Sequence, residues 1–122
     1  MMTGFVCVGI GGAVGAMLRY AISLIPYKDG FPVLTLITNI LGALAIGIIA
    51  GAAARKGLPD NTVLFLKTGV CGGFTTFSTF SLEAYNLLEQ GNARMSVLYI
   101  ALSVIGCLAG VAAGMYAAER FV

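Results

Sequence analysis

Hydrophobic residues fill four long stretches of the chain, and short polar connections separate them. The stretches cover approximately residues 3–25, 33–54, 62–88 and 96–118. At 1.5 Å per residue the second alone reaches about 33 Å, enough to cross the hydrocarbon core of a bilayer. The connections read PYKDGFP, RKGLPDN and EQGNAR, and their proline, glycine and charged residues are typical helix stops. The pattern predicts an all-α membrane protein, with four transmembrane helices forming a single domain over residues 1–122.

Composition supports this interpretation. The chain has a mean hydropathy of +0.97, with 59% hydrophobic and 10% charged residues, and a soluble domain of 122 residues could not bury so much apolar surface. The net charge of +2 is not clustered and gives no support for nucleic-acid binding. Histidine is absent, which excludes an imidazole proton relay and a histidine-ligated metal. Cys7, Cys71 and Cys107 match no zinc pattern, so we interpret them as buried structural thiols.

Lysine and arginine give almost no preference for one orientation in the membrane. Four crossings place both termini on the same side, and the basic residues divide nearly evenly between the two sides. A chain with so little bias is able to insert in both orientations. The terminal side holds Arg55, Lys56 and Arg120, with Lys67 near it, and the other side holds Lys28 and Arg94, with Arg19 near it.

The third stretch contains the unusual segment GVCGGFTTFSTFS, residues 69–81. Gly69, Gly72 and Gly73 weaken a helix there, and Thr75 or Thr76 can cap a restarted one. Unwound backbone is tolerated in a membrane only where protein or a cavity satisfies it, and such breaks recur at ion sites. One break offers about two free carbonyls, too few for a cation. Two copies related by a two-fold axis in the membrane plane would offer four, and that axis requires antiparallel subunits.

Several polar side chains lie within the hydrophobic stretches. Asn39 can serve as interhelical glue or as a donor pointed into an ion path. Arg19 can snorkel to the headgroups or raise the anion concentration at a pore entrance. Glu83 is the only acid well inside a stretch, and it falls in register with Thr75 and Thr79. A polar stripe of this kind requires a water-filled groove or another protein surface.

Phe77 and Phe80 are three residues apart and share one helix face. Packing is the usual role of such a pair, but the positive edges of the rings could also stabilise a small bare anion. Hydroxyl and amide groups would then complete an uncharged path, although serine and threonine oxygens could equally serve cations. The candidate donors are Asn39, Ser78, Thr79, Tyr99 and Ser103.

At these residues the sequence resembles a known family, the Fluc (CrcB) fluoride channels. The resemblance extends over the whole chain and includes GGAVGAMLRY, TLITNILG and GVCGGFTTFSTFSLE. It implies four-helix subunits with a broken third helix, assembled as an antiparallel, dual-topology homodimer in the cell inner (plasma) membrane. It also implies passive, selective conduction of fluoride, which lowers the fluoride concentration in the cytoplasm.

The resemblance assigns roles to particular residues. It implies a fluoride pathway, a vestibule, and a structural sodium ion that is bound by backbone carbonyls and is not transported. Cys107 stands where a further track serine is expected and is a weaker donor. The pathway residues are Asn39, Phe77, Ser78, Thr79, Phe80, Tyr99 and Ser103; the vestibule residues are Arg19 and Glu83; and the sodium carbonyls are those of Gly72 and Thr75.

Three other classes of protein are alternatives to a channel. A small proton-coupled multidrug exporter needs a buried glutamate in its first helix and aromatic residues for cationic drugs, but the first stretch has no acid and the chain has no tryptophan. A non-conducting assembly subunit would use its regularly spaced small residues, such as Gly11 and Gly15, only for packing against partners. An enzyme is least expected, because the sequence contains no nucleophile–base pair or metal-ligand set.

Overall fold

The computed structural model describes all residues from Met1 to Val122 and contains only helices. Three long helices are apolar enough to cross a membrane: α1 (Met2–Ser23), α2 (Val33–Lys56) and α6 (Ala93–Phe121). The helix α6 extends beyond the stretch predicted at residues 96–118, because hydropathy marks the apolar part of a helix and not its polar ends. The helix α2 ends at Gly57, whose φ of 66° suits a residue without a side chain.

The third hydrophobic stretch forms four short elements. These are α3 (Asp60–Val63), the π-helix η1 (Leu64–Cys71), α4 (Gly72–Phe74) and α5 (Phe77–Glu89). Thr75 and Thr76 interrupt them with extended backbone, at φ −88°, ψ 156° and φ −149°, ψ 116°. The expected broken third helix is therefore present, and the break lies just after the glycines, since Gly72 itself remains helical.

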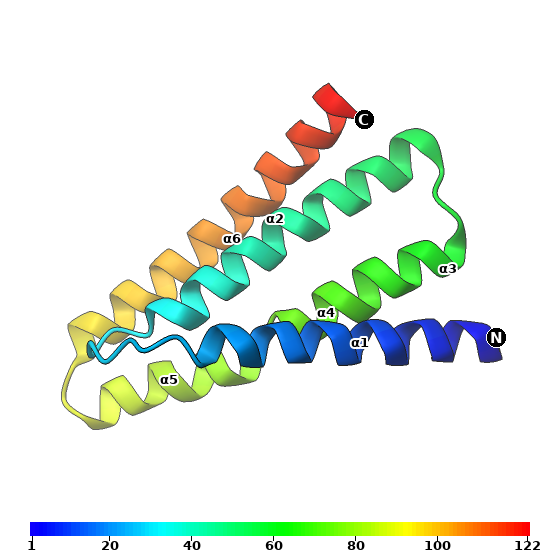
Figure 1. Cartoon of the computed structure of the whole chain (residues 1–122). Coiled ribbons are helices and arrows are strands. Elements are labelled where there is room, and N and C mark those ends of the chain that lie inside the picture. The colour runs from blue at the N-terminus through cyan, green and yellow to red at the C-terminus, as the bar shows by residue number, and fades with distance from the viewer.

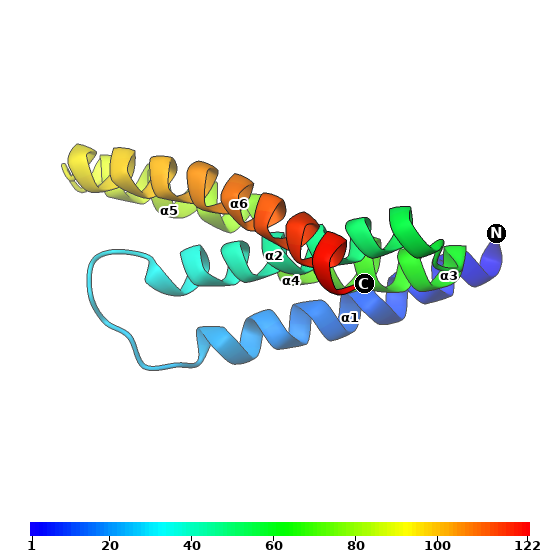
Figure 2. The same cartoon turned by 90° about the horizontal axis from the view of Figure 1, so that it is seen from above.

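The helices form two pairs that diverge from one another. Figure 1 shows α2 running along α6, while α1 runs along the segment that contains α3 and α4. Both termini and the α2–α3 connection lie at one end of the molecule, and the other two connections lie at the opposite end (Figures 1 and 2). The pieces α3 to α5 together make the third of four crossings, and both termini are at the same end of the molecule.

Glycines allow the two helices of each pair to pack with their backbones in contact. A Cβ atom on Gly15 would overlap the Val70 carbonyl oxygen, and one on Gly47 would overlap the Val111 carbonyl oxygen. Lipid gives little hydrophobic drive for helix association, so packing of small residues holds such helices together. Gly15 and Gly47 therefore serve close packing of the helices.

The hydrophobic core of one chain is small. It consists of Phe80, Ala84, Leu87 and Tyr99, where α5 meets α6, and Phe31 from the α1–α2 connection packs against it. Only 19 of 122 residues are buried, so most apolar side chains of a single chain face outwards. Lipid or another protein surface must cover them.

Gly15→Ala is predicted to destabilise the chain by about 1–3 kcal/mol, because its methyl group has no space against η1. Gly9→Ala is the matched control on the same helix, since a Cβ atom there meets nothing within 4 Å. The control should be neutral or slightly stabilising, because alanine favours helix over glycine. Thermal unfolding in detergent measures both variants. Equal midpoints for the two would show that the α1–η1 approach does not limit stability.

Candidate functional site

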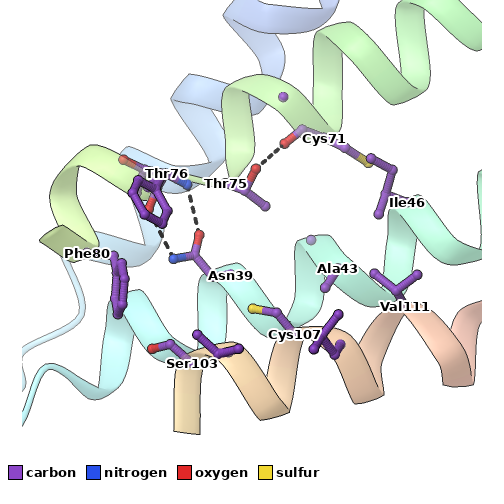
Figure 3. A pocket seen from close by; sticks show the side chains of 15 residues that line it. Asn39, Ala43, Ile46, Cys71, Thr75, Thr76, Phe80, Ser103, Cys107 and Val111 are labelled. Atoms are coloured by element: carbon purple, nitrogen blue, oxygen red, sulfur yellow. Dashed lines mark hydrogen bonds between the residues drawn. The ribbon is translucent and has the colours of Figure 1, made fainter. Parts of the chain in front are cut away.

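The helix break is held by a side chain from another helix. Asn39 on α2 accepts a hydrogen bond from the Thr76 N–H (2.8 Å) and donates one to the Thr76 carbonyl (3.1 Å). Figure 3 shows the Asn39 side chain pointing towards the Thr76 backbone, with dashed lines for the two hydrogen bonds. Asn39 is 9% exposed, so both contacts are shielded from solvent. The amide retains one N–H and one oxygen lone pair for a further partner.

Three more side chains satisfy the backbone around the break. The Thr76 hydroxyl oxygen accepts a hydrogen bond from the Thr79 N–H (3.1 Å), so Thr76 is the N-cap of α5, as the sequence allowed. The Thr75 hydroxyl donates to the Cys71 carbonyl (2.9 Å). Arg19 Nε donates to the Gly73 carbonyl (3.2 Å), so this arginine is anchored at the break by a contact that snorkelling alone would not make.

These contacts change which backbone carbonyls have donors. In a continuous helix the Thr76 N–H would donate to the Gly72 carbonyl, but here it donates to Asn39. The Thr79 N–H would likewise donate to the Thr75 carbonyl, but it donates to the Thr76 side chain. The carbonyls of Gly72 and Thr75 therefore lose their helical donors, and both residues line the same groove. The chain has no cluster of three or more Cys, Asp or Glu side chains that could hold a metal ion.

That groove has a volume of about 440 Å³ and lies between the break, α2 and α6 (Figure 3). Most of its wall is apolar. The polar side chains on it include Asn39 and Ser103, and Cys107 lies one turn along α6 from Ser103. Ser103 is 6% exposed, and its Oγ is a buried side-chain oxygen with no hydrogen-bond partner. A buried hydroxyl without a partner costs free energy, so Ser103 beside the groove is an unfilled polar position.

The two phenylalanines occupy different surroundings. Phe77 is 78% exposed at the groove, whereas Phe80 is 8% exposed and packs into the core. Their ring centroids are 5.5 Å apart, and the Phe80 and Tyr99 centroids are 5.1 Å apart. Phe31 makes an edge contact with Tyr99 at 5.6 Å. Sequence patterns did not single out Phe31, because it lies in a connection without helical periodicity.

The remaining predicted residues lie away from this groove. Thr79 and Arg19 line a second, smaller cavity of about 70 Å³, together with threonines from α2. Tyr99 is fully buried and its hydroxyl donates to Glu83 Oε1 (3.0 Å). Ser78 is exposed and contacts the Thr76 hydroxyl (3.3 Å). The structure thus divides the predicted polar residues among the groove, the small cavity and the Tyr99–Glu83 pair, and leaves Ser78 exposed.

The fold and these contacts define a multi-pass helical membrane protein. Residues 6–115 match the family model described as "CrcB-like protein, Camphor Resistance (CrcB)". One relative, "Fluoride-specific ion channel FluC" of Ruminiclostridium cellulolyticum, is 49% identical over 97% of this chain and 94% of its own length. A relative of the same name from Methylobacterium sp. (strain 4-46) is 46% identical over 92% of this chain and 93% of its own length. The chain therefore belongs to the CrcB-like family, whose matched relatives are by name ion channels and not enzymes.

Thr76→Val keeps the shape of the side chain but deletes the cap oxygen, so it is predicted to cost about 0.5–2 kcal/mol of stability. The Thr79 amide should also exchange with solvent faster, because it loses its acceptor. Thr68→Val, at an exposed position of η1, is the matched control. Thermal unfolding and hydrogen exchange measure the two effects. Unchanged exchange at Thr79 would show that this cap does not hold the start of α5.

Proposed function

We propose that this chain forms a fluoride-selective channel that exports fluoride passively across the cell inner (plasma) membrane. The proposal rests mainly on Ser103, which lines the same groove as Asn39 and Phe77 and whose buried hydroxyl has no hydrogen-bond partner. These groups are uncharged and can face a small anion with O–H, N–H or ring-edge positive charge. Membership of the CrcB-like family and the names of its relatives support fluoride as the ion.

The proposed channel is an antiparallel homodimer. A single chain leaves its groove open on one side, and Phe77 at its rim is largely exposed. An inverted second copy would cover the groove and bury this ring. The near balance of basic residues on the two sides is compatible with insertion in both orientations. By symmetry, such a dimer has two equivalent grooves and therefore two pathways of opposite direction.

The pathway follows the donors along the groove. Fluoride is small and strongly hydrated, so a narrow path has to replace much of its water with other donors. Asn39 and Ser103 are such donors, and the edges of Phe77 and Phe80 complete the wall. Ser78, Thr79 and the Tyr99–Glu83 pair extend it, while Arg19 beside the small cavity attracts anions to the entrance. No lysine or arginine lines the groove, so the anion is not held too tightly to leave.

A sodium ion is the proposed cofactor at the centre of the dimer. The Gly72 and Thr75 carbonyls have lost their helical donors, and two copies would supply four such oxygens. When bound, sodium supplies positive charge that holds the two breaks together; it is structural and is not transported. Asn39 contributes by binding the Thr76 peptide, which keeps the Gly72 carbonyl free.

Purified protein in liposomes is predicted to release fluoride, with little or no release of chloride, in the absence of any other protein. Asn39→Asp should reduce fluoride flux at least ~100-fold, because the carboxylate cannot donate to Thr76 and places negative charge in the path. Phe77→Ile should also reduce it strongly, because it keeps bulk but deletes the ring edge. Ion-selective electrodes measure both fluxes.

Matched controls for these variants lie elsewhere on the chain. Phe5→Ile changes an exposed ring on α1, and Asn86→Asp changes an exposed amide on α5, so both should keep the native rate. Native flux in Asn39→Asp would remove Asn39 from the path, and native flux in Phe77→Ile would remove the aromatic argument. Equal release of fluoride and chloride by the unaltered protein would rule out selectivity.

Replacing sodium with a large organic cation is predicted to lower both the fluoride flux and the thermal midpoint of the dimer. A ligand present at 100 times its Kd stabilises the state that binds it by about 2.7 kcal/mol, so the shift should saturate as sodium is returned. Potassium at the same ionic strength is the control for screening. A midpoint and flux that are the same in all three salts would contradict a structural sodium ion.

A further inference from the structure

Besides Arg19, which donates to the Gly73 carbonyl, two charged side chains lie at membrane depth and have no ion-pair partner in their own subunit. Lys67 is exposed on η1, seven residues after α3 begins, or about 10 Å along the helix. Glu83 on α5 is half-buried and contacts the Tyr99 hydroxyl. Charges inside a membrane are costly unless they are paired or reach water. Each of these residues therefore needs an explanation.

The surroundings of Lys67 show which way it points. Gly69 lies against Gly11, so that face of η1 is turned towards α1. Residues two positions apart on a helix point in nearly opposite directions, so Lys67 is directed away from α1. Cys71, one turn further on, lines the groove that a second copy would cover. Lys67 thus lies on the side of η1 where the partner subunit is proposed to bind.

The two charges lie at equal sequence distances on either side of the break. Lys67 is eight residues before Thr75, and Glu83 is eight residues after it. The proposed two-fold axis lies in the membrane plane and passes through the two breaks, so it exchanges the two ends of the molecule. It therefore places Lys67 of one subunit at the depth of Glu83 of the other. We infer that Lys67 pairs with the partner subunit's Glu83, twice in each dimer; this rests on the proposed antiparallel assembly.

The pair also has a consequence for conduction. An ionised Glu83 next to Tyr99 would repel an anion from that hydroxyl. The partner subunit's Lys67 balances this charge, so the part of the pathway next to Tyr99 carries no net negative charge. The pair would also favour the antiparallel arrangement, because a parallel dimer would place like charges at the same depth.

A charge exchange tests the pair. Lys67→Glu and Glu83→Lys should each weaken the dimer roughly tenfold or more, because each places like charges opposite one another. The double variant restores opposite charges and should return the dimer Kd to within a few-fold of the native value. The double variant Lys56→Glu with Glu83→Lys is the matched control and should not recover. Dimer dissociation in detergent, followed by fluorescence transfer between labelled subunits, measures each Kd. No recovery in the first double variant would overturn the pairing.

Cross-linking gives a second readout if the single variants fold poorly. In a background with all three native cysteines replaced by alanine and shown to dimerise, subunits carrying Lys67→Cys are mixed with subunits carrying Glu83→Cys. A short bifunctional thiol reagent should join only unlike subunits. A stable dimer in which like subunits are joined would indicate a parallel assembly, which contradicts the proposed function as well. An antiparallel dimer without cross-links between unlike subunits would contradict the pairing alone.

Discussion

The backbone polar groups freed by the break at Thr75–Thr76 must be satisfied where water is scarce. An unpaired N–H or carbonyl in such a place costs several kcal/mol. This cost is the reason that irregular backbone does not occur in contact with lipid. The chain meets this requirement mainly with one amide, because Asn39 binds both the N–H and the carbonyl of Thr76. Arg19 satisfies the Gly73 carbonyl from the side of α1. The two carbonyls that lose their helical donors belong to Gly72 and Thr75, which line the groove, and this makes the break a candidate ion site.

The packing of the other helices holds the two halves of the broken crossing in place, but it leaves the groove beside the break open. Gly11 and Gly15 allow the backbones of α1 and η1 to touch, and this contact positions the part of the third crossing that precedes the break. The small core around Tyr99 fixes the second half against α6. The groove between the break, α2 and α6 stays open, and a buried hydroxyl at Ser103 stays without a partner. A second copy and an anion are the proposed occupants, and both follow from unfilled positions in one chain.

Much of the fold could be predicted, because hydropathy and helix stops are properties of the sequence itself. The long helices follow from apolar length, and the break follows from three glycines and two threonines within the eight residues 69–76. The cap at Thr76 is local and could also be anticipated. By contrast, the bond from Asn39 to Thr76 joins residues 37 positions apart, and no periodicity predicts it. The π-helix η1 likewise has no signal in the pattern.

The candidate site was harder to predict than the helices for the same reason. A step of four placed Thr75, Thr79 and Glu83 on one stripe, but the break at Thr75–Thr76 changes the direction of the chain within that stripe. Thr75 consequently lines the groove, Thr79 lines the small cavity and Glu83 contacts Tyr99. None of the three side chains is fully exposed. Their separation into three surroundings depends on tertiary packing that sequence spacing does not describe.

The most direct test of the central claim, that inverted copies share their broken helices, is the orientation of individual chains in a membrane. A single cysteine in place of Val122, with the native cysteines replaced by alanine, reports the side of the C-terminus when sealed vesicles are treated with an impermeant maleimide. About half of the chains should react before the vesicles are opened and the rest only afterwards, as expected for a sequence with balanced basic residues. Reaction of all chains from one side would contradict the account.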